Sequence, residues 1–203
     1  MEKEILLIRH GETDFNKELR YQGHMDVDLN ETGYMQAQKI SERLSTQPID
    51  VVYSSDLKRA KYAAEVIAAP HQLELNTSRG LREIDFGDWE GLTYDDLRRD
   101  YPDLIKKWYD NPVSVRPPGG EMLSEFKQRV VDCLQGVIKN CEEEKIAIIA
   151  HGGTIRVWLA HLLEIPLNKN WRIEIHNTGL SIIKLYEDYP VIKLLNSTYH
   201  LDQ

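Results

Sequence analysis

The sequence predicts an α/β fold, a three-layer α/β/α sandwich with a mostly parallel central sheet. Short apolar runs that are followed at once by polar residues are typical of buried parallel strands. Longer segments with helical apolar spacing lie between these runs, as in a layered α/β domain. The 203 residues, 41% of them hydrophobic, suffice for a substantial core. We therefore expect residues 1–203 to form a single domain.

Five apolar runs are the predicted strands. The segments 5–8, 51–54 and 146–150 each run directly into polar residues and are expected to be buried and parallel. The segments 180–185 and 191–195 are two further candidates, with the turn-like residues EDYP between them.

Four segments carry apolar residues at helical spacing, namely 31–45, 56–69, 121–143 and 153–163. Asp56 is a candidate N-cap for the second of them. The stretch 82–120 differs from the rest, because it contains Trp89 and Trp108 and ends in the breaker RPPGG. We expect it to be a lid-like insertion over the carboxyl ends of the strands. For the two tryptophans, packing in a core or interface is favoured over lining the lid.

The charge balance excludes several classes of partner. With 33 acidic and 25 basic side chains, the net charge is −8, which disfavours nucleic acid and anionic membranes. A few cations gathered in a cleft could still bind a small anionic substrate. No apolar run approaches the roughly 18 residues of a membrane helix, and the N-terminal run is too short for a secretory signal.

The cysteine spacing indicates reduced thiols. Cys133 and Cys141 lie in one predicted helix. At a rise of ~1.5 Å per residue they would be about 12 Å apart, beyond disulfide reach. We expect a cytoplasmic protein, present as a monomer or homodimer.

Two predicted strands end in the same kind of motif. The first runs into Arg9-His10-Gly11, and the strand at 146–150 runs into His151-Gly152-Gly153. Ligands of open α/β sheets bind outside the carboxyl ends of the strands. The glycines permit a tight turn and a close approach of a ligand, and the following helix N-terminus favours an anion. Packing alone explains such a repeated arrangement poorly.

With these motifs, the sequence resembles the histidine phosphatase superfamily, also called phosphoglycerate mutase-like. The resemblance spans nearly the whole chain through RHGETDFN (9–16), YQGH (21–24), SSDLKRA (54–60), LREIDFGDWEG (81–91), PPGGE (117–121) and HGGTIR (151–156). DFGDWEG together with PPGGE resembles the alpha-ribazole phosphatases and the broad-specificity phosphatases.

The resemblance implies a role for each matching residue. His10 would attack phosphorus and form a phosphohistidine, which requires a neutral imidazole. Arg9 and Arg59 would bind phosphoryl oxygens as planar forks. His151 would donate to an equatorial oxygen, and Glu83 would protonate the leaving oxygen and then activate water. The residues expected to complete the substrate-binding pocket are Asn16, Gln22, Gly23 and Gly152.

Some of these residues have other interpretations. Arg59 lies in the charged run KRAK, which alone would indicate a solvated helix face. Glu83 could form a surface ion pair with a neighbour, and Asp85 and Glu90 are rival acids. Asn177-Thr178-Gly179 is expected to form a turn. No HExxH or CxxC occurs, so we expect no catalytic metal and no cofactor.

The expected function is hydrolysis of a small phosphate ester, with alpha-ribazole 5′-phosphate as the leading substrate. YQGH is closer to the broad-specificity enzymes. The alternatives are a mutase and a non-catalytic binding module on the same fold. Phosphoglycerate mutases resemble this chain less, because they carry a basic ERHYG-type stretch where LREIDFGDWEG stands here. A non-catalytic module would be expected to lose a residue of the motif, and none is lost.

Overall fold

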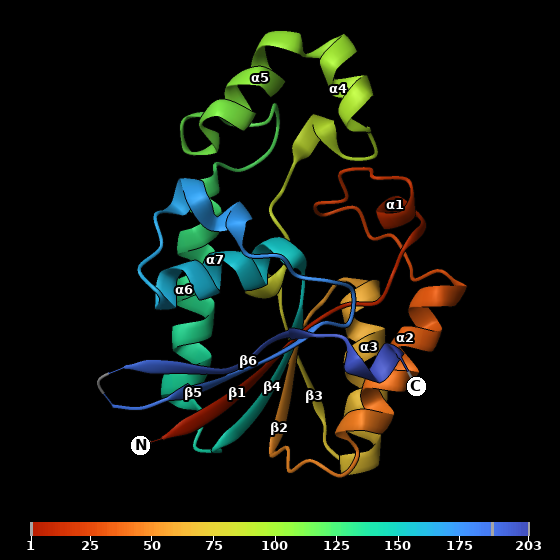
Figure 1. Cartoon of the computed structure of the whole chain (residues 1–203), viewed down its shortest axis with the longest axis vertical. Helices are drawn as coiled ribbons and strands as arrows, with labels where there is room; N and C mark the ends of the chain where they lie inside the picture. The colour runs from red at the N-terminus through yellow and green to blue at the C-terminus, as the bar shows by residue number, and fades with distance from the viewer. Residues whose placement is uncertain (1, 188, 203) are drawn as a thin grey trace.

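The fold is built on a six-stranded sheet, in a computed structural model that describes residues 2–187 and 189–202 (Figure 1). The strand order is β3-β2-β4-β1-β5-β6. The strands are β1 (Lys3–Arg9), β2 (Val51–Ser55), β3 (Leu75–Ser78), β4 (Lys145–Ala150), β5 (Leu180–Leu185) and β6 (Pro190–Ser197). β1, β2, β3 and β4 pair in parallel, whereas β5 pairs antiparallel with both β1 and β6. The predicted mostly parallel sheet is confirmed.

Helices cover both faces of this sheet, which confirms the three layers (Figure 1). The helices are α1 (Asp14–Lys17), α2 (Glu31–Leu44), α3 (Lys58–Ala68), α4 (Tyr94–Asp100), α5 (Pro102–Asp110), α6 (Leu123–Asn140) and α7 (Gly152–Leu162). Short 3₁₀ turns are η1 (Ala69–His71), η2 (Arg79–Leu81), η3 (Gly87–Trp89), η4 (Pro112–Ser114), η5 (Leu167–Arg172) and η6 (Tyr199–Leu201). Among the described residues, no helix has the length and apolar character needed to cross a bilayer.

Alternation along β1 explains why an unbroken apolar run forms a strand. Ile5 and Leu7 belong to the core that α6 and α7 cover, while Leu6 and Ile8 belong to the core under α2 and α3. Successive side chains of a strand point to opposite faces, so a strand buried on both sides needs apolar residues throughout. The polar residues begin where the sheet ends, at Arg9.

The start of α3 differs from the prediction. The helix begins at Lys58 with Leu57 as N-cap, and no side chain caps it. Asp56 instead accepts two hydrogen bonds from Arg82, at 2.7 and 2.6 Å. A bidentate guanidinium is a stronger partner for a carboxylate than a helix N-terminus, and it ties β2 to the segment that begins at residue 82.

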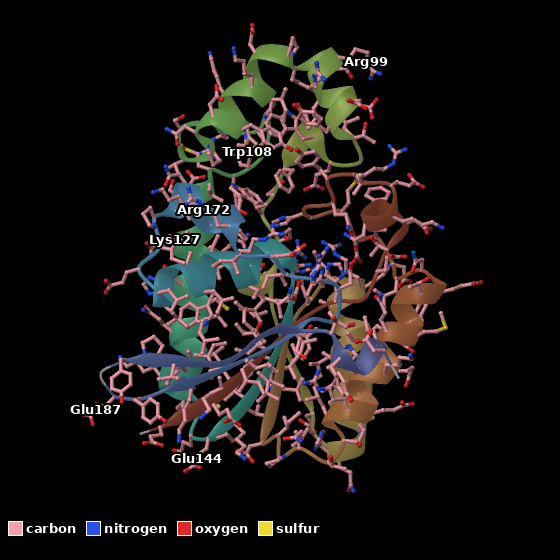
Figure 2. All side chains as sticks on the ribbon, viewed as in Figure 1. Arg99, Trp108, Lys127, Glu144, Arg172 and Glu187 are labelled. Carbon is pink, nitrogen blue, oxygen red and sulfur yellow. The ribbon has the colours of Figure 1, made fainter. Side chains whose placement is uncertain are left out.

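The segment 82–120 lies beyond the carboxyl ends of the parallel strands, where α4 and α5 form the top of the molecule in Figure 1. Its own aromatic cluster holds it together. Trp89 and Trp108 are buried with ring centroids 5.5 Å apart, and Phe86 and Tyr101 contact them. Figure 2 shows Arg99 of α4 at the outer surface, in contrast to Trp108 of α5, which is buried. Packing of the two tryptophans, rather than lining of a lid, is confirmed.

Candidate active site

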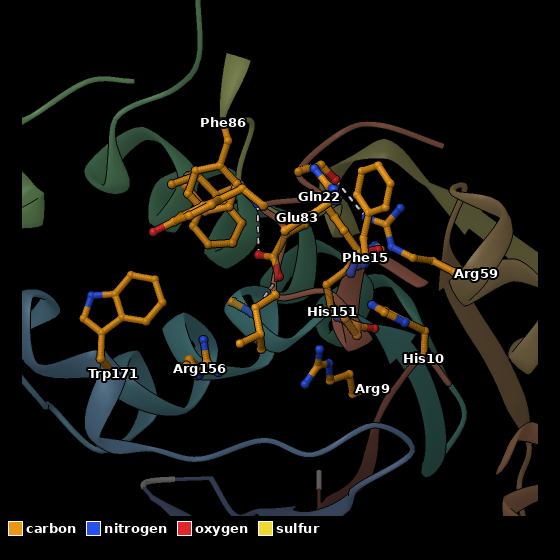
Figure 3. Close-up of a pocket in the computed structure, with 18 of the residues that line it drawn as sticks. Arg9, His10, Phe15, Gln22, Arg59, Glu83, Phe86, His151, Arg156 and Trp171 are labelled. Carbon is orange, nitrogen blue, oxygen red and sulfur yellow. Dashed lines mark hydrogen bonds between the residues drawn. The ribbon is translucent and has the colours of Figure 1, made fainter. Parts of the chain in front are cut away.

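The pairing of β1 with β4 brings the two His-Gly motifs together. Arg9 is opposite Ala150 in the parallel register, so the next residues, His10 and His151, leave the sheet side by side. Their ring centroids are 5.1 Å apart and both side chains are buried. Nitrogen atoms gather at this place in Figure 2, and Figure 3 shows the two rings beside Arg9.

His10 is held in one tautomer. Its Nδ1 lies 2.7 Å from the carbonyl oxygen of Gly11, and a carbonyl can only accept, so Nδ1 carries the proton. Burial, and then the positive charges of Arg59 and Arg9, lower the pKa of His10 well below its usual range. The ring is therefore neutral, with an unprotonated Nε2. This is the state that a nucleophilic imidazole requires.

Gly11 is required by a close backbone contact. A Cβ on Gly11 would lie 2.3 Å from the carbonyl oxygen of Gly33, at the start of α2. The loop that follows His10 therefore packs against the helix backbone with no room for a side chain.

Two guanidinium groups flank the histidines, that of the fully buried Arg59 and that of the half-buried Arg9. Arg59 is fully buried on the first turn of α3 and donates to the carbonyl oxygens of Met25 (2.7 Å) and Gly23 (2.8 Å). Arg9 donates to the carbonyl oxygen of Ile175 at 2.8 Å. Burial lowers the pKa of each to about 10, so both stay charged at neutral pH. A solvated helix face is thus the wrong interpretation for Arg59.

Several buried polar atoms of the site have no hydrogen-bond partner within the described part of the protein. Among the described residues, the Nε atoms of Arg9 and Arg59 and both ring nitrogens of His151 have no hydrogen-bond partner. An unpaired buried polar group is costly, so the donors among these atoms are suited to bind an anionic ligand. Burial, and then Arg59 and His10, lower the pKa of His151 well below its usual range, so its neutral ring has one N–H to donate.

Of the three candidate acids, Glu83 is the one that lines the cavity. It accepts hydrogen bonds from the backbone N–H groups of Gly153 (2.9 Å) and Ile84 (3.0 Å). Asp85 lies 3.5 Å from the Nδ1 atom of His24 and accepts from the Gly87 backbone. Glu90 accepts from three backbone N–H groups, those of His24, Met25 and Phe86.

The predicted site residues surround one cavity of about 560 Å³ (Figure 3). Its walls include Arg9, His10, Asn16, Gln22, Gly23, Arg59, Glu83 and His151. Gly152 differs, because it lies against the Arg9 guanidinium and Gly153 lines the cavity in its place. A Cβ at Gly153 would lie 2.1 Å from the Glu83 Oε1 atom, so a side chain there would displace this carboxylate.

A family model of the histidine phosphatase superfamily (branch 1) matches residues 5–198. The chain belongs to this superfamily. It is 40% identical to phosphoglycerate mutase-like protein 4 of Arabidopsis thaliana, covering 98% of this chain and 87% of that protein. It is 35% identical to phosphoserine phosphatase 1 of Hydrogenobacter thermophilus, covering 98% and 94%. The structure of the alpha-ribazole phosphatase from Shigella flexneri matches with a TM-score of 0.90 at 29% identity, covering 96% of each chain. These likenesses support a hydrolase of the histidine-phosphatase type.

Two residues of the site, Arg156 and Asn177, were missed in the sequence analysis. Arg156 lines the cavity, donates to the carbonyl oxygen of Ile173 (3.0 Å) and stacks on Trp171. The spacing in the sequence could have predicted Arg156 as a site residue. It lies about one helical turn after Gly152 and therefore on the same side of α7. Asn177 lay in an expected turn, yet its amide donates to the carbonyl oxygen of His10 at 3.1 Å. No local pattern indicates that contact.

The cavity is strongly positive in a chain of net charge −8. The guanidinium groups of Arg9, Arg59, Arg156 and Arg20 line it, and Glu83 is the acidic side chain among its lining residues. Within residues 2–187 and 189–202, no group of His, Cys, Asp or Glu could hold a metal ion. The planar guanidinium group of arginine can donate two parallel hydrogen bonds, which suits the oxygens of a phosphoryl group.

The buried histidines predict how folding stability depends on pH. His10 and His151 have a lower pKa in the folded chain than the ~6.5 expected when unfolded, so the unfolded chain binds more protons below that pH. The free energy of unfolding should therefore fall as the pH is lowered from 7.5 to 5. Urea denaturation at both pH values measures it.

A matched pair of variants tests the cause. His10→Gln should weaken this pH dependence, to which His151 still contributes, whereas His176→Gln, at an exposed position, should leave it unchanged. Equal stability of the parent chain at the two pH values would contradict the expectation.

Proposed function

We propose that this chain is a phosphomonoesterase that hydrolyses a small phosphate ester through a phosphohistidine at His10. The observation that carries the proposal is the neutral His10 ring, which is flanked by Arg9 and Arg59. The Gly11 carbonyl accepts a hydrogen bond from its Nδ1–H group. This geometry leaves Nε2 as a nucleophile at the place where the guanidinium groups would hold a phosphoryl group.

In the first step, the Nε2 lone pair of His10 attacks phosphorus and the ester P–O bond breaks. Arg9, Arg59 and His151 donate to the equatorial oxygens, whose charge they stabilise without moving. The amide of Asn16 adds a donor, because its Oδ1 is occupied by Thr13 and Asn177. Glu83 transfers its carboxyl proton to the departing oxygen.

In the second step, water attacks the phosphohistidine. The Glu83 carboxylate, now deprotonated, takes one proton from the water as the O–P bond forms and the N–P bond breaks. Inorganic phosphate leaves, His10 recovers its lone pair, and Glu83 has regained the proton it gave away. The cycle needs no group beyond these side chains.

We also propose that the segment 82–120 covers the cavity, within one domain formed by residues 1–203. Phe86, Tyr94 and Tyr109 of this segment line the cavity, opposite Phe15 from α1. Such a cover limits the access of bulk water and supplies apolar contacts to the leaving group.

The nucleophile can be tested by trapping. His10→Ala should abolish turnover, because no other side chain occupies its place beside the arginines. Acid-sensitive, base-stable labelling of the protein by a ³²P substrate should appear in the parent and in the exposed-site control His176→Ala, but not in His10→Ala. Equal labelling of His10→Ala would contradict the assignment.

The proton donor can be tested with two leaving groups. Glu83→Gln should slow phosphoryl transfer from an alkyl phosphate by roughly 10²–10⁴-fold, the usual contribution of general acid catalysis. Transfer from p-nitrophenyl phosphate should slow much less, because that leaving group departs as an anion. The comparison uses the burst rate or kcat/KM, with Asp85→Asn as the matched control. Equal slowing of both substrates would reject Glu83 as the acid.

The aromatic wall supports alpha-ribazole 5′-phosphate, whose base is a flat ring system, as the substrate. Its kcat/KM should exceed that of ribose 5-phosphate by about two- to tenfold, since ring stacking contributes ~0.5–1.5 kcal/mol. Phe15→Ala should reduce the ratio. The panel should include phosphoserine and 3-phosphoglycerate, with the products analysed. A preference for phosphoserine would contradict this substrate, and isomerisation of phosphoglycerate would favour the mutase alternative.

A further inference from the structure

Thr178, next to the candidate active site, has a backbone conformation that its side chain disfavours. Its φ is +51°, in the left-handed region, and the residue is fully buried. A β-branched residue is a genuine outlier there, and such a conformation persists only where the surroundings impose it. Thr178 lies in the turn between η5 and β5, far from His10 in sequence.

This turn is bonded to the backbone of the proposed nucleophile. The Thr178 N–H lies 3.1 Å from the carbonyl oxygen of Arg9 and 3.2 Å from that of His10. The Asn177 amide donates to the same His10 carbonyl at 3.1 Å, and the Arg9 N–H contacts the Gly179 carbonyl at 3.4 Å. The left-handed turn at Thr178 is what aims these groups at the end of β1.

A buried histidine from the end of the chain holds the Thr178 side chain. The Nε2 atom of His200, in η6, lies 3.0 Å from the Thr178 Oγ1 atom. On its other side, Arg43 Nη1 lies 3.5 Å from His200 Nδ1. A guanidinium can only donate, so Nδ1 is the accepting nitrogen and Nε2 carries the proton.

The surroundings keep His200 neutral and in place. Burial is the main cause that lowers its pKa to about 4, with Arg43 and Lys39 adding to it. The η6 turn and the end of β6 are tied to α2, because Lys39 donates to the Leu201 carbonyl (3.2 Å) and Arg43 to the Ser197 hydroxyl (3.1 Å). His200 therefore presents a fixed N–H donor to Thr178.

We propose that His200 is a positioning residue: its hydrogen bond to Thr178 keeps the left-handed turn that fixes the backbone of His10 for attack on phosphorus. The inference rests on the proposed function of the same site. His200 touches neither the cavity nor substrate, and it acts only through Thr178 and the His10 carbonyl.

Two substitutions remove the bond from opposite ends. His200→Phe keeps a flat ring but no donor, and Thr178→Val removes the hydroxyl while leaving a β-branched side chain. Each should slow single-turnover phosphorylation of His10 about tenfold, with the KM for p-nitrophenyl phosphate changed less than threefold, because Arg9 and Arg59 keep their own side-chain anchors. The double variant should be no slower than either single one, since both remove one interaction.

A conservative substitution of His200 and a substitution of a neighbouring residue serve as controls. His200→Gln keeps an N–H donor and should recover most of the rate, and Tyr199→Ala, at an exposed position of the same turn, should match the parent. All rates are measured well below the melting temperature of each variant. In ¹⁵N NMR spectra, the parent His10 should show one tautomer with Nδ1 protonated, and His200→Phe should show a mixture.

Unchanged rates in both single variants, or losses that multiply in the double variant, would overturn the inference. If His200→Phe does not fold, Thr178→Val decides, because it preserves size and shape. A parent chain that forms no phosphohistidine would overturn the proposed function instead. In that case the tautomer of His10 still shows whether His200 positions the ring.

Discussion

The structure depends on the parallel pairing of β1 with β4. Because Arg9 is opposite Ala150, the two His-Gly motifs begin at the same edge of the sheet, and their rings meet at 5.1 Å. A shift of the register by one residue would turn every side chain of β1 to the other face, and would separate the histidines. The apolar residues that secure this register, Ile5 and Ile146 among them, are therefore as necessary for the site as the histidines.

Burial gives this site both its chemistry and its cost. It keeps His10 and His151 neutral and lowers the pKa of Arg9 and Arg59 to about 10, while their charges find few partners in the protein. An anion that accepts hydrogen bonds from these groups would bind the folded chain but not the unfolded chain. Its binding would therefore stabilise the fold. The unpaired donors of the two arginines are thus suited to bind an anion.

Much of this could be predicted from the sequence, and the exceptions have physical reasons. The strand at 146–150 and the residues after it could be placed because an unbroken apolar run followed by His-Gly is a local pattern. Asp56 was misassigned because its partner, Arg82, is near only after folding. The contacts of Asn177 and His200 link distant segments through single hydrogen bonds, which no periodicity reveals. Helices α4 and α5 were missed because they are short, with seven and nine residues, although α5 does have an apolar face.

The position of β1 in the sheet has a consequence for how the chain is made. Residue 4 pairs with residue 145 on one side and residue 184 on the other, so β1 has no neighbour in the sheet until residues about 140 positions later have been synthesised. Such non-local pairing slows folding and leaves an apolar strand uncovered during synthesis. The two histidines of the candidate site can therefore meet only after residues 145–151 have been synthesised, long after His10 itself.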